Sequence, residues 1–500
     1  GGWPTTAFLT PDGRVIGGGT YFPPEQMRQL LRDVKSSWQK TQGSTISEIE
    51  TPESESKSVE DLSSDIVEEI VGEIANNFDP IYGGFGSQPK FPHTEALELA
   101  LARYHYTGNR EYLKIVAITL KNTASGGLYD SKMGGFFRYS TVRDWSIPHY
   151  EKMSEDNAKW LQLFLHAFEA TGEAFYAEIA RGIIEYVNAW LSDQESGCFF
   201  GSQDADEEYY RLTKAERLKL KPPFVDKQIY TNWNSMMISS YLDASFTLSD
   251  LSLREFALKS LDRLLNLNYK KGEGVYHFHD GQPRLPNQLM DQATTCNTLY
   301  RAYEATGDER YFQLAEEIIQ IASTQLYDKD HGGFFDTVVN PTAQGLLGKH
   351  VKPLDENSIT ARALTKLYHM AGKERYRKQA EETLKPFSEV YPNFGFMSAE
   401  YGLAVDSFLN EPTIIQIVGD ITQPETRGLL TEANRVYEPR KVIKVLNPEK
   451  DSDTITSSGF RITDQSTAYI CVGRACTAPI TEPRKIAPEL SNMLASQANK

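Results

Sequence analysis

A short loop motif, Asp-x3-Gly-Gly-Phe, recurs along this chain and constrains its fold more than any other feature. Three full copies and three degenerate copies follow one another at intervals of roughly fifty to seventy-five residues. The full copies lie at 79–85, 130–136 and 328–334, and the degenerate ones at 193–199, 268–275 and 391–396. A repeat of this length is one supersecondary unit, which buries its apolar face only against neighbouring units.

A helix-stop signal runs in phase with this loop. Four apolar helical stretches each end at a glycine, with an aromatic residue four positions later. The glycines are Gly108, Gly172, Gly307 and Gly372, and Ser249 occupies the corresponding position of another copy. Glycine ends a helix here because it adopts the left-handed conformation without a Cβ penalty. Each repeat therefore reads helix, glycine turn, helix and loop.

The periodicity of apolar residues predicts twelve helices in six pairs. In 155–171, Trp160, Phe164 and Phe168 share one face, while Glu155 and Lys159 lie off it. The other helices are expected at about 59–77, 93–107, 110–123, 174–191, 232–247, 252–267, 287–305, 309–325, 356–371, 374–389 and 398–409. Six such hairpins form either a closed (α/α)6 toroid or an open solenoid. We expect the toroid, because long, glycine-rich and aromatic loops suit the mouth of one central cavity.

Segments at both ends fall outside the repeats. Residues 1–42 are expected to form two strands and an amphipathic helix, and the polar residues 43–57 read as a linker. The toroid then spans 58–410. Residues 411–500 contain strand-like segments around a helix near 423–435, which predicts a small α/β lobe that caps the toroid.

Composition and charge exclude several partners. The net charge of −16 argues against nucleic acid and anionic membranes. No apolar run approaches the roughly 20 residues of a membrane helix. Four scattered cysteines suit a reducing compartment, so we expect a cytoplasmic protein. The chain begins at Gly1 without a methionine, so the lack of a signal peptide carries no weight. The oligomeric state is not indicated.

The densest set of reactive side chains lies between residues 138 and 157. We expect His149 and Glu151 to transfer protons, as a base and its orienting partner or as an acid/base pair. Aromatic and polar neighbours suit the binding of a sugar. These ligand-binding candidates are Arg138, Tyr139, Trp145, Lys152, Asp156 and Asn157. Alternatively, Glu151 and Asp156 stabilise a helix start, and Lys152 pairs with Asp156.

Two further groups are candidates with plain structural alternatives. Asp204 and Asp206 could act as acid and base, or belong to a solvated acidic loop that opens an insertion at 207–230. Lys90 could approach a ligand at the mouth or stabilise a loop carboxylate. Trp233 could wall the cavity, and Asn234 could bind a ligand or cap a helix.

No metal or cofactor is expected. His277 and His279 alternate on a strand-like segment but have no third ligand nearby. No phosphate-binding loop or dinucleotide fingerprint occurs. Cys471 and Cys476 lack two further metal ligands. A disulfide and two free thiols are both open for this pair, and we expect free thiols.

Several motifs, taken together, resemble one known family over nearly the whole chain. They are Gly2-Trp-Pro-Thr5, Phe8 to Gly13, Gly19 to Pro24, Phe85 to Pro92, Gly134 to Ser140, Trp145 to Met153, Asp156-Asn157, Gln203 to Asp206, Trp233-Asn234, and Cys471, Cys476 and Pro479. This set resembles the spermatogenesis-associated, thioredoxin-domain-containing family, whose bacterial members are the YyaL-like proteins. The resemblance implies a thioredoxin-like domain fused to a six-hairpin toroid similar to N-acylglucosamine 2-epimerases.

The chain departs from that family in two places. The family's thioredoxin-like half brings a Cys-x-x-Cys-type motif, which is expected upstream of Gly1 and is not in this sequence. Pro4 matches the position of that fold's cis-proline. The family also reads Gly-Gly-Phe-His-Arg-Tyr where this chain has Phe137 in place of the histidine. That substitution removes a proton-transfer group.

Three functions remain open at this point. The leading hypothesis is a carbohydrate-active or carbohydrate-binding toroid that takes a small sugar-like ligand, with sugar epimerase or isomerase chemistry at His149 and Glu151. The second is a non-catalytic binding platform fused to a thiol–disulfide domain. The third is a glycoside hydrolase, which requires two facing carboxylates.

Overall fold

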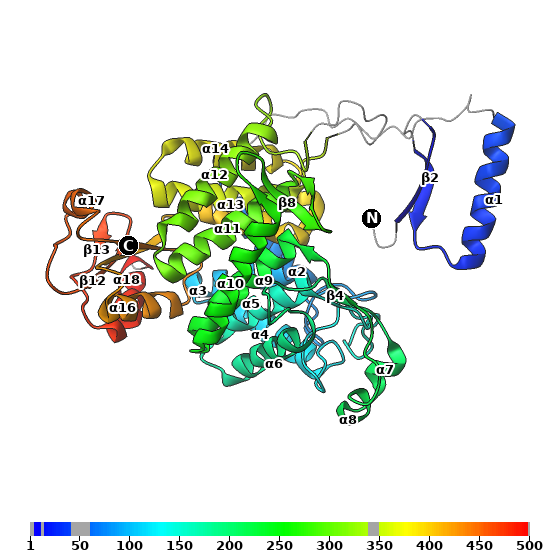
Figure 1. Ribbon diagram of the computed structural model, residues 1–500, viewed down its shortest axis with the longest axis horizontal. Coiled ribbons are helices and arrows are strands. Elements are labelled where there is room, and N and C mark those ends of the chain that lie inside the picture. The colour runs from blue at the N-terminus through cyan, green and yellow to red at the C-terminus, as the bar shows by residue number, and fades with distance from the viewer. Residues whose placement is uncertain (1–4, 12–14, 42–60, 339–349, 499–500) are drawn as a thin grey trace.

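The twelve expected helices form a closed ring in the computed structural model, which describes residues 5–11, 15–41, 61–338 and 350–498 (Figure 1). Six helices line the inside of the ring, and each packs against the next until α15 returns to α3. The inner helices are α3 (Thr94–Thr107), α5 (Ser154–Thr171), α9 (Thr231–Thr247), α11 (Leu289–Thr306), α13 (Leu354–Ala371) and α15 (Ala399–Leu409). The ring is a closed (α/α)6 toroid, so the open solenoid is excluded.

Six outer helices cover the inner ring, one behind each inner helix. They are α2 (Ser64–Asn77), α4 (Arg110–Ser125), α6 (Ala174–Trp190), α10 (Leu251–Asn268), α12 (Glu309–Gln325) and α14 (Glu374–Leu384). The apolar face expected for α5 is buried, with Trp160 and Phe164 fully enclosed. α2 begins five residues later than the expected start at 59, and α14 gives way early to a 3-10 turn, Lys385–Phe387.

The glycine turns join each inner helix to its outer partner. Gly108, Gly172, Gly307 and Gly372 all have φ between +66° and +73°, and each donates its backbone N–H to a carbonyl of the preceding turn. Ser249 takes the same left-handed region at φ +58°, without the steric freedom of glycine. The in-phase marker therefore corresponds to a turn at the same end of five hairpins, whereas the sixth pair, α15 with α2, joins the last and first helices of the ring and has no such turn.

The Gly-Gly-Phe loops gather at the opposite end, where outer helices lead into inner ones. Phe85, Phe136, Phe199 and Phe334 are buried, and each pairs in a short β-bridge with the residue that precedes the loop aspartate. A Cβ at Gly134 would lie 2.1 Å from the carbonyl oxygen of Gly182 on the neighbouring helix, so only glycine fits. These loops surround the N-terminal ends of the inner helices and form the rim of the ring.

Several short strands lie at this rim. β3 (Lys152–Met153), β4 (Ser202–Gln203) and β5 (Val225–Asp226) form one sheet, and β6 (Ile229–Tyr230) pairs with β8 (Gly274–His279). β8 also pairs with β7 (Tyr269–Lys270) and β9 (Pro283–Pro286). The expected insertion carries two short helices, α7 (Glu207–Arg211) and α8 (Lys214–Arg217), which project from the ring in Figure 1. Residues Tyr391–Ser398 form a further 3-10 segment.

The N-terminal segment has the expected elements. β1 (Thr5–Leu9) pairs antiparallel with β2 (Val15–Thr20), and α1 (Pro24–Thr41) follows. Pro4 and the expected linker at 43–57 lie outside the described residues.

The C-terminal lobe is a four-stranded sheet with helices on it. β10 (Thr413–Val418) runs parallel to β11 (Lys441–Leu446) and antiparallel to β12 (Thr467–Val472), which pairs with β13 (Ala475–Cys476). Its helices are α16 (Pro424–Arg435), α17 (Ser452–Ser457), a 3-10 turn at Pro483–Lys485 and α18 (Ile486–Ala498). Ile415, Leu429 and Ile470 form its core. The lobe contacts α9, α11 and α13, at one end of the ring.

The expectation of free thiols at Cys471 and Cys476 is wrong, because these residues form a disulfide. The two cysteines face each other across the β12–β13 hairpin, with Cα atoms 4.1 Å apart. A two-residue turn at 473–474 places positions five apart directly opposite, within reach of a disulfide. The other two cysteines, Cys198 and Cys296, are buried and free, as expected for apolar packing.

Candidate functional site

A cavity of about 500 Å³ lies along the axis of the ring, and all six inner helices contribute to its wall. α5 presents Glu155, Lys159, Gln162, His166 and Glu169 to it, spaced alternately by four and three residues. α13 repeats this spacing with Asp355, Ile359, Arg362, Lys366 and His369. This period keeps side chains on one face of a helix. These inner helices therefore have an apolar face against the outer helix and a charged face toward the cavity.

Ion pairs tie the wall together near the rim. The Nζ atom of Lys159 lies 2.9 Å from Glu95 Oε1 and 2.9 Å from Glu155 Oε1, which joins α5 to α3. On the neighbouring helices, Arg362 Nη1 donates to Glu400 Oε1 at 2.8 Å. Asp355 lies about two helical turns before Arg362 on the same cavity face, and no ion pair to it occurs among the described residues.

The carboxyl groups of this wall differ in proton affinity. Burial opposes ionisation of Glu95, but the charge of Lys159 and the hydrogen bonds from Lys159 and the backbone together outweigh it and lower the pKa of Glu95 to about 2. Burial, together with the nearby carboxylates of Glu400 and Glu95, raises the pKa of Asp355 to about 6, although this side chain is reached by water from the cavity. One carboxyl is therefore always ionised near neutral pH, while the other exchanges a proton. Such a split is the arrangement that acid–base catalysis uses.

The C-terminal lobe closes the far end of the cavity. Residues 434 and 436–442 line it there, at the C-terminal ends of the inner helices. Glu438 accepts hydrogen bonds from Tyr106 and from the ring of His105, whose Nε2 is 3.0 Å away. Asn434 Nδ2 donates to the carbonyl oxygen of Glu304 at 2.9 Å. The lobe thus covers the end of the cavity opposite the rim, where the Gly-Gly-Phe loops and inner-helix N-termini lie.

The predicted cluster between 138 and 157 lies at this rim. Arg138 Nη1 is 3.3 Å from Glu151 Oε2, while His149 Nδ1 is 3.8 Å from the same oxygen, beyond a hydrogen bond. Tyr139 stacks on His149, with ring centroids 4.9 Å apart, and on Phe91, at 4.7 Å. Burial lowers the pKa of His149. None of these residues is among those that line the cavity, so the cluster flanks it.

Asp156 connects the rim cluster to the cavity wall. It follows Glu155, which lines the cavity, and it is the second acidic residue in the first turn of α5. Burial, with Glu155 nearby, raises the pKa of Asp156 to about 7. Within the described part of the chain, its Oδ2 atom is buried and has no hydrogen-bond partner. An unsatisfied buried carboxyl that holds a proton near neutral pH is a candidate for function.

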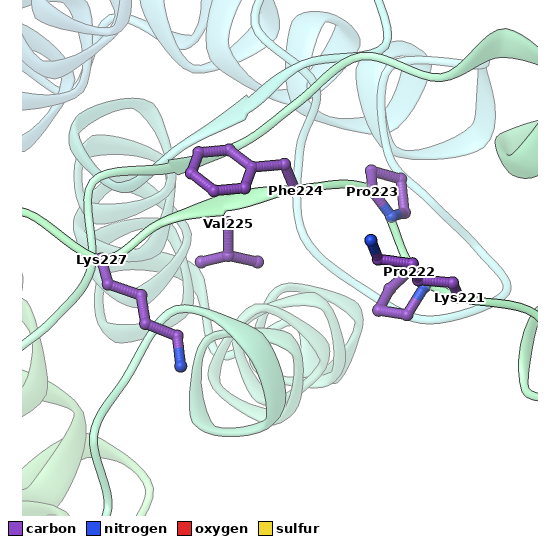
Figure 2. A pocket seen from close by; sticks show the side chains of 6 residues that line it. All are labelled: Lys221, Pro222, Pro223, Phe224, Val225 and Lys227. Carbon is purple, nitrogen blue, oxygen red and sulfur yellow. The ribbon is translucent and has the colours of Figure 1, made fainter.

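A second pocket, of about 440 Å³, lies on the insertion (Figure 2). A single stretch of chain forms its wall, with Pro222, Pro223, Phe224 and Val225 between the side chains of Lys221 and Lys227. This wall contains no carboxylate, histidine or amide side chain, so it offers no acid–base chemistry.

Known proteins resemble both the N-terminal segment and nearly the whole of this chain. The family named Thioredox_DsbH, described as a protein of unknown function (DUF255), matches residues 1–55. Human spermatogenesis-associated protein 20 is 24% identical, and the alignment covers 97% of this chain and 78% of that protein. The resemblance drawn from the sequence motifs is confirmed.

Solved structures with the same ring are sugar-processing enzymes. A cellobiose 2-epimerase from Bacillus thermoamylovorans superposes with a TM-score of 0.53 at 13% identity, over 65% of this chain and 88% of that one. A family 76 α-mannanase from Bacteroides thetaiotaomicron gives 0.50 at 13% identity, over 68% and 94%. At such low identity these likenesses show the fold alone, the (α/α)6 toroid.

Several residues predicted to bind a ligand form hydrogen bonds within the fold, and ligand binding by them stays a prediction. Lys90 Nζ donates to Asp79 Oδ2 at 2.9 Å, as its structural alternative anticipated. Lys152 Nζ donates to Asp130 Oδ2 at 2.9 Å, and not to Asp156. Both lysines are fully buried. Trp145, also buried, donates its indole N–H to the carbonyl oxygen of Tyr82 at 2.8 Å.

The two predicted asparagines clamp the repeat loops. Asn157 accepts from the backbone N–H of Phe136 at 2.8 Å and donates to its carbonyl oxygen at 3.0 Å. Asn234 makes the same two bonds to Phe199, at 2.7 and 3.0 Å. Asn234 is not a helix cap, because the N-cap of α9 is Tyr230. Ligand binding by these residues stays an untested prediction, and they are left out of the proposed site.

The remaining candidates lie toward solvent or beside the rim. Asp204 and Asp206 are exposed, and Asp206 caps α7 by accepting from the N–H of Tyr209 at 2.9 Å. Trp233 is half-buried and packs on Tyr230, with ring centroids 4.7 Å apart. Within the described ranges, no group of three or more His, Cys, Asp or Glu side chains could hold a metal ion, and no helix is long and apolar enough to cross a membrane.

Sequence reasoning missed the charged wall of the cavity. Its members near the rim are Glu95, Glu155, Lys159, Asp355, Arg362 and Glu400. A signal was present in the polar residues that lie off the apolar face of each inner helix, with a spacing of four and three. That pattern is also typical of a helix whose outer face meets solvent.

Proposed function

We propose that the central cavity binds a small sugar-like molecule and acts on it by acid–base chemistry. The observation that carries this proposal is a pair of cavity carboxyls in different surroundings: Glu95 is paired with Lys159 at 2.9 Å, whereas Asp355 has no ion pair among the described residues. In this role Asp355 donates and accepts a proton, and ionised Glu95 offsets positive charge on the ligand. Charged and amide groups beside them, Arg362 and Gln162 among others, suit ligand hydroxyls.

The shape of the cavity supports a small ligand. A volume of about 500 Å³, closed by the C-terminal lobe, falls within the range of small-molecule sites. The ring shared with a cellobiose 2-epimerase and an α-mannanase adds fold-level support, which is weak on its own for function.

In this proposal the cluster between residues 138 and 157 forms the entrance to the site. The stacked rings of Phe91, Tyr139 and His149 offer an aromatic face for a sugar ring. Proton transfer by His149 and Glu151 remains a prediction, in which the separation of 3.8 Å closes when a ligand binds.

Epimerase or isomerase chemistry and glycoside hydrolysis both use such carboxyls, and one assay separates them. The protein is incubated in D2O with a panel of aldoses, ketoses and disaccharides, and the sugars are followed by proton NMR. Isomerase-type proton transfer replaces a C–H beside the carbonyl with C–D, whereas hydrolysis releases a new reducing end without such exchange. Either reaction must be lost in Asp355→Asn. A panel unchanged after long incubation contradicts catalysis.

A second function is favoured by the N-terminal segment. The match of residues 1–55 and the β1–β2–α1 order agree with the closing half of a thioredoxin-like domain. Phe137, where the family has histidine, is buried between Tyr150 and Tyr210 and transfers no proton. In this alternative the toroid binds without turnover, and a Cys-x-x-Cys pair upstream performs thiol–disulfide exchange. A reductase assay on the product of the complete reading frame tests it, and inactivity removes the redox function.

The cytoplasmic location stays a prediction, and the disulfide removes one of its grounds. It rested partly on cysteines that form no disulfide, whereas Cys471 and Cys476 are bonded.

A further inference from the structure

A histidine–aspartate pair, His277 with Asp291, lies at the rim of the ring. His277 is on β8, and Asp291 is in the first turn of α11. The Nδ1 atom of His277 is 2.9 Å from Asp291 Oδ2 and 3.2 Å from Oδ1. Asp291 is fully buried, while the His277 side chain is 30% exposed. The carboxylate is therefore hidden behind the imidazole, which faces outward.

The contacts of the pair define which nitrogen can react. Asp291 also accepts from the backbone N–H of Asn232 at 3.0 Å, so its position is held from two sides. A carboxylate at Nδ1 keeps the proton on that nitrogen and leaves Nε2 as the acceptor. Among the described residues no hydrogen bond reaches Nε2 of His277. The same strand offers a contrast in His279, whose Nδ1 accepts from the N–H of Gly281 and has no carboxylate partner.

The pair lies beside an aromatic wall and the cavity entrance. The ring of Tyr230 is 5.7 Å from that of His277, and Trp233 packs on the other side of Tyr230. Met290, the residue before Asp291, lines the cavity. The Oδ1 atom of Asn232 is buried and has no partner within the described chain. An aromatic face, an oriented base and an unsatisfied amide oxygen together form a site for a hydroxyl-bearing ligand.

We propose that His277, oriented by Asp291, is a proton acceptor for a hydroxyl group of a sugar bound against Tyr230 and Trp233 at the mouth of the cavity. This rests on the proposed sugar-binding function. In the step, the ligand O–H bond breaks, an Nε2–H bond forms, and the electron pair stays on the ligand oxygen. Asp291 offsets the positive charge of the imidazolium, and the proton returns to the ligand from Nε2. No further reactant is required.

The hydrogen bond to Asp291 also affects the pKa of the His277 imidazole. Although burial of the ring opposes it, this hydrogen bond raises the pKa of His277.

The test uses the whole chain with 13Cε1-labelled histidine, in which His277→Gln identifies the His277 signal. We expect Asp291→Asn to lower the proton affinity of His277 by about tenfold, one pH unit. We expect a sugar that raises the melting temperature to shift the His277 signal, and Trp233→Ala to weaken that shift. His279→Gln, on the same strand, is the matched control and leaves sugar affinity unchanged, while His277→Gln weakens it about tenfold.

The outcomes separate this proposal from the broader one. A sugar that stabilises the protein without moving the His277 signal overturns the role of His277 and leaves cavity binding intact. Equal affinities in His277→Gln and His279→Gln do the same, even if Asp291→Asn does not fold. If no sugar in the panel stabilises the protein, the proposed function fails and this proposal fails with it.

Discussion

The repeat loops and the cavity wall meet at the first turns of the same inner helices and both contain ion pairs, but the wall and its border also hold carboxyls that have no ion pair among the described residues. In the loops, buried charges are paired, as Lys152 is with Asp130, and Asn157 satisfies the backbone of Phe136. In and beside the cavity, Asp355 and Asp156 have raised pKa values, and one oxygen of Asp156 has no partner among the described residues. Satisfied groups stabilise the fold, whereas groups held at a raised pKa oppose its stability and point to function.

The largest effect is expected where a loop carboxylate is removed. Asp130→Ala leaves the buried cations of Lys152 and Arg217 without their shared partner, which lies 2.9 and 2.6 Å from them. Breaking a buried ion pair in this way costs about 3–5 kcal/mol. Urea unfolding measures the loss. Asp328→Ala is the matched control, because its partner Lys352 is 19% exposed and loses less on removal of the carboxylate. Equal losses would show that burial does not set the contribution of these pairs.

A somewhat smaller loss is expected from an asparagine clamp. Asn157→Ala leaves the buried N–H and carbonyl oxygen of Phe136 without partners, which should cost about 1–3 kcal/mol in total. Asn297, on the cavity wall, is the control, and its replacement by alanine should change the free energy of unfolding by less than about 0.5 kcal/mol. Comparable losses at both positions would remove the distinction between loop and wall.

Replacement of Asp156 is expected to increase stability, in contrast to the two losses above. Its carboxyl has a pKa of about 7 in the folded state against 3.8 for the ordinary group. Below about pH 3 the group is protonated in both states, so it costs nothing. As pH rises toward 7 the unfolded state ionises first and the folded state loses stability. Asp156→Asn should therefore raise the free energy of unfolding at pH 8 by about 2 kcal/mol, about half of what the full shift gives because Asp156 is only half-buried, and leave it unchanged at pH 3. A loss of stability at pH 8 would contradict a carboxyl kept at a raised pKa.

The smallest effect is expected at the surface of a loop. His331 lies 3.3 Å from Asp328 but its side chain is 81% exposed. Exposed ion pairs contribute little, so His331→Ala should change stability by less than about 0.5 kcal/mol. A larger change in thermal unfolding would mean that the loops depend on more than their buried bonds.

Patterns among residues close in sequence predicted the fold better than they predicted the candidate site. The repeated loop and the glycine turns predicted the helices and favoured the ring, because both depend on residues close in sequence. The partners of Lys90, Lys152 and Asn157 come from distant turns, so their residue types alone read as ligand-binding groups. The charged stripe of Glu155 and Lys159 faces a cavity only once the ring closes. Among short-range features, the hairpin that joins Cys471 to Cys476 was readable from its spacing and was still missed.

The central claim is that the cavity binds a sugar, and thermal unfolding with a panel of mono- and disaccharides, sugar phosphates and N-acetyl sugars tests it most directly. A ligand that binds only the folded state raises the melting temperature with concentration. We expect one sugar class to do so for the wild type, with the shift lost in Asp355→Asn, which alters the cavity, and reduced in Glu151→Gln, which alters the rim. The claim is contradicted if no sugar raises the melting temperature, or if the shift persists unchanged in Asp355→Asn.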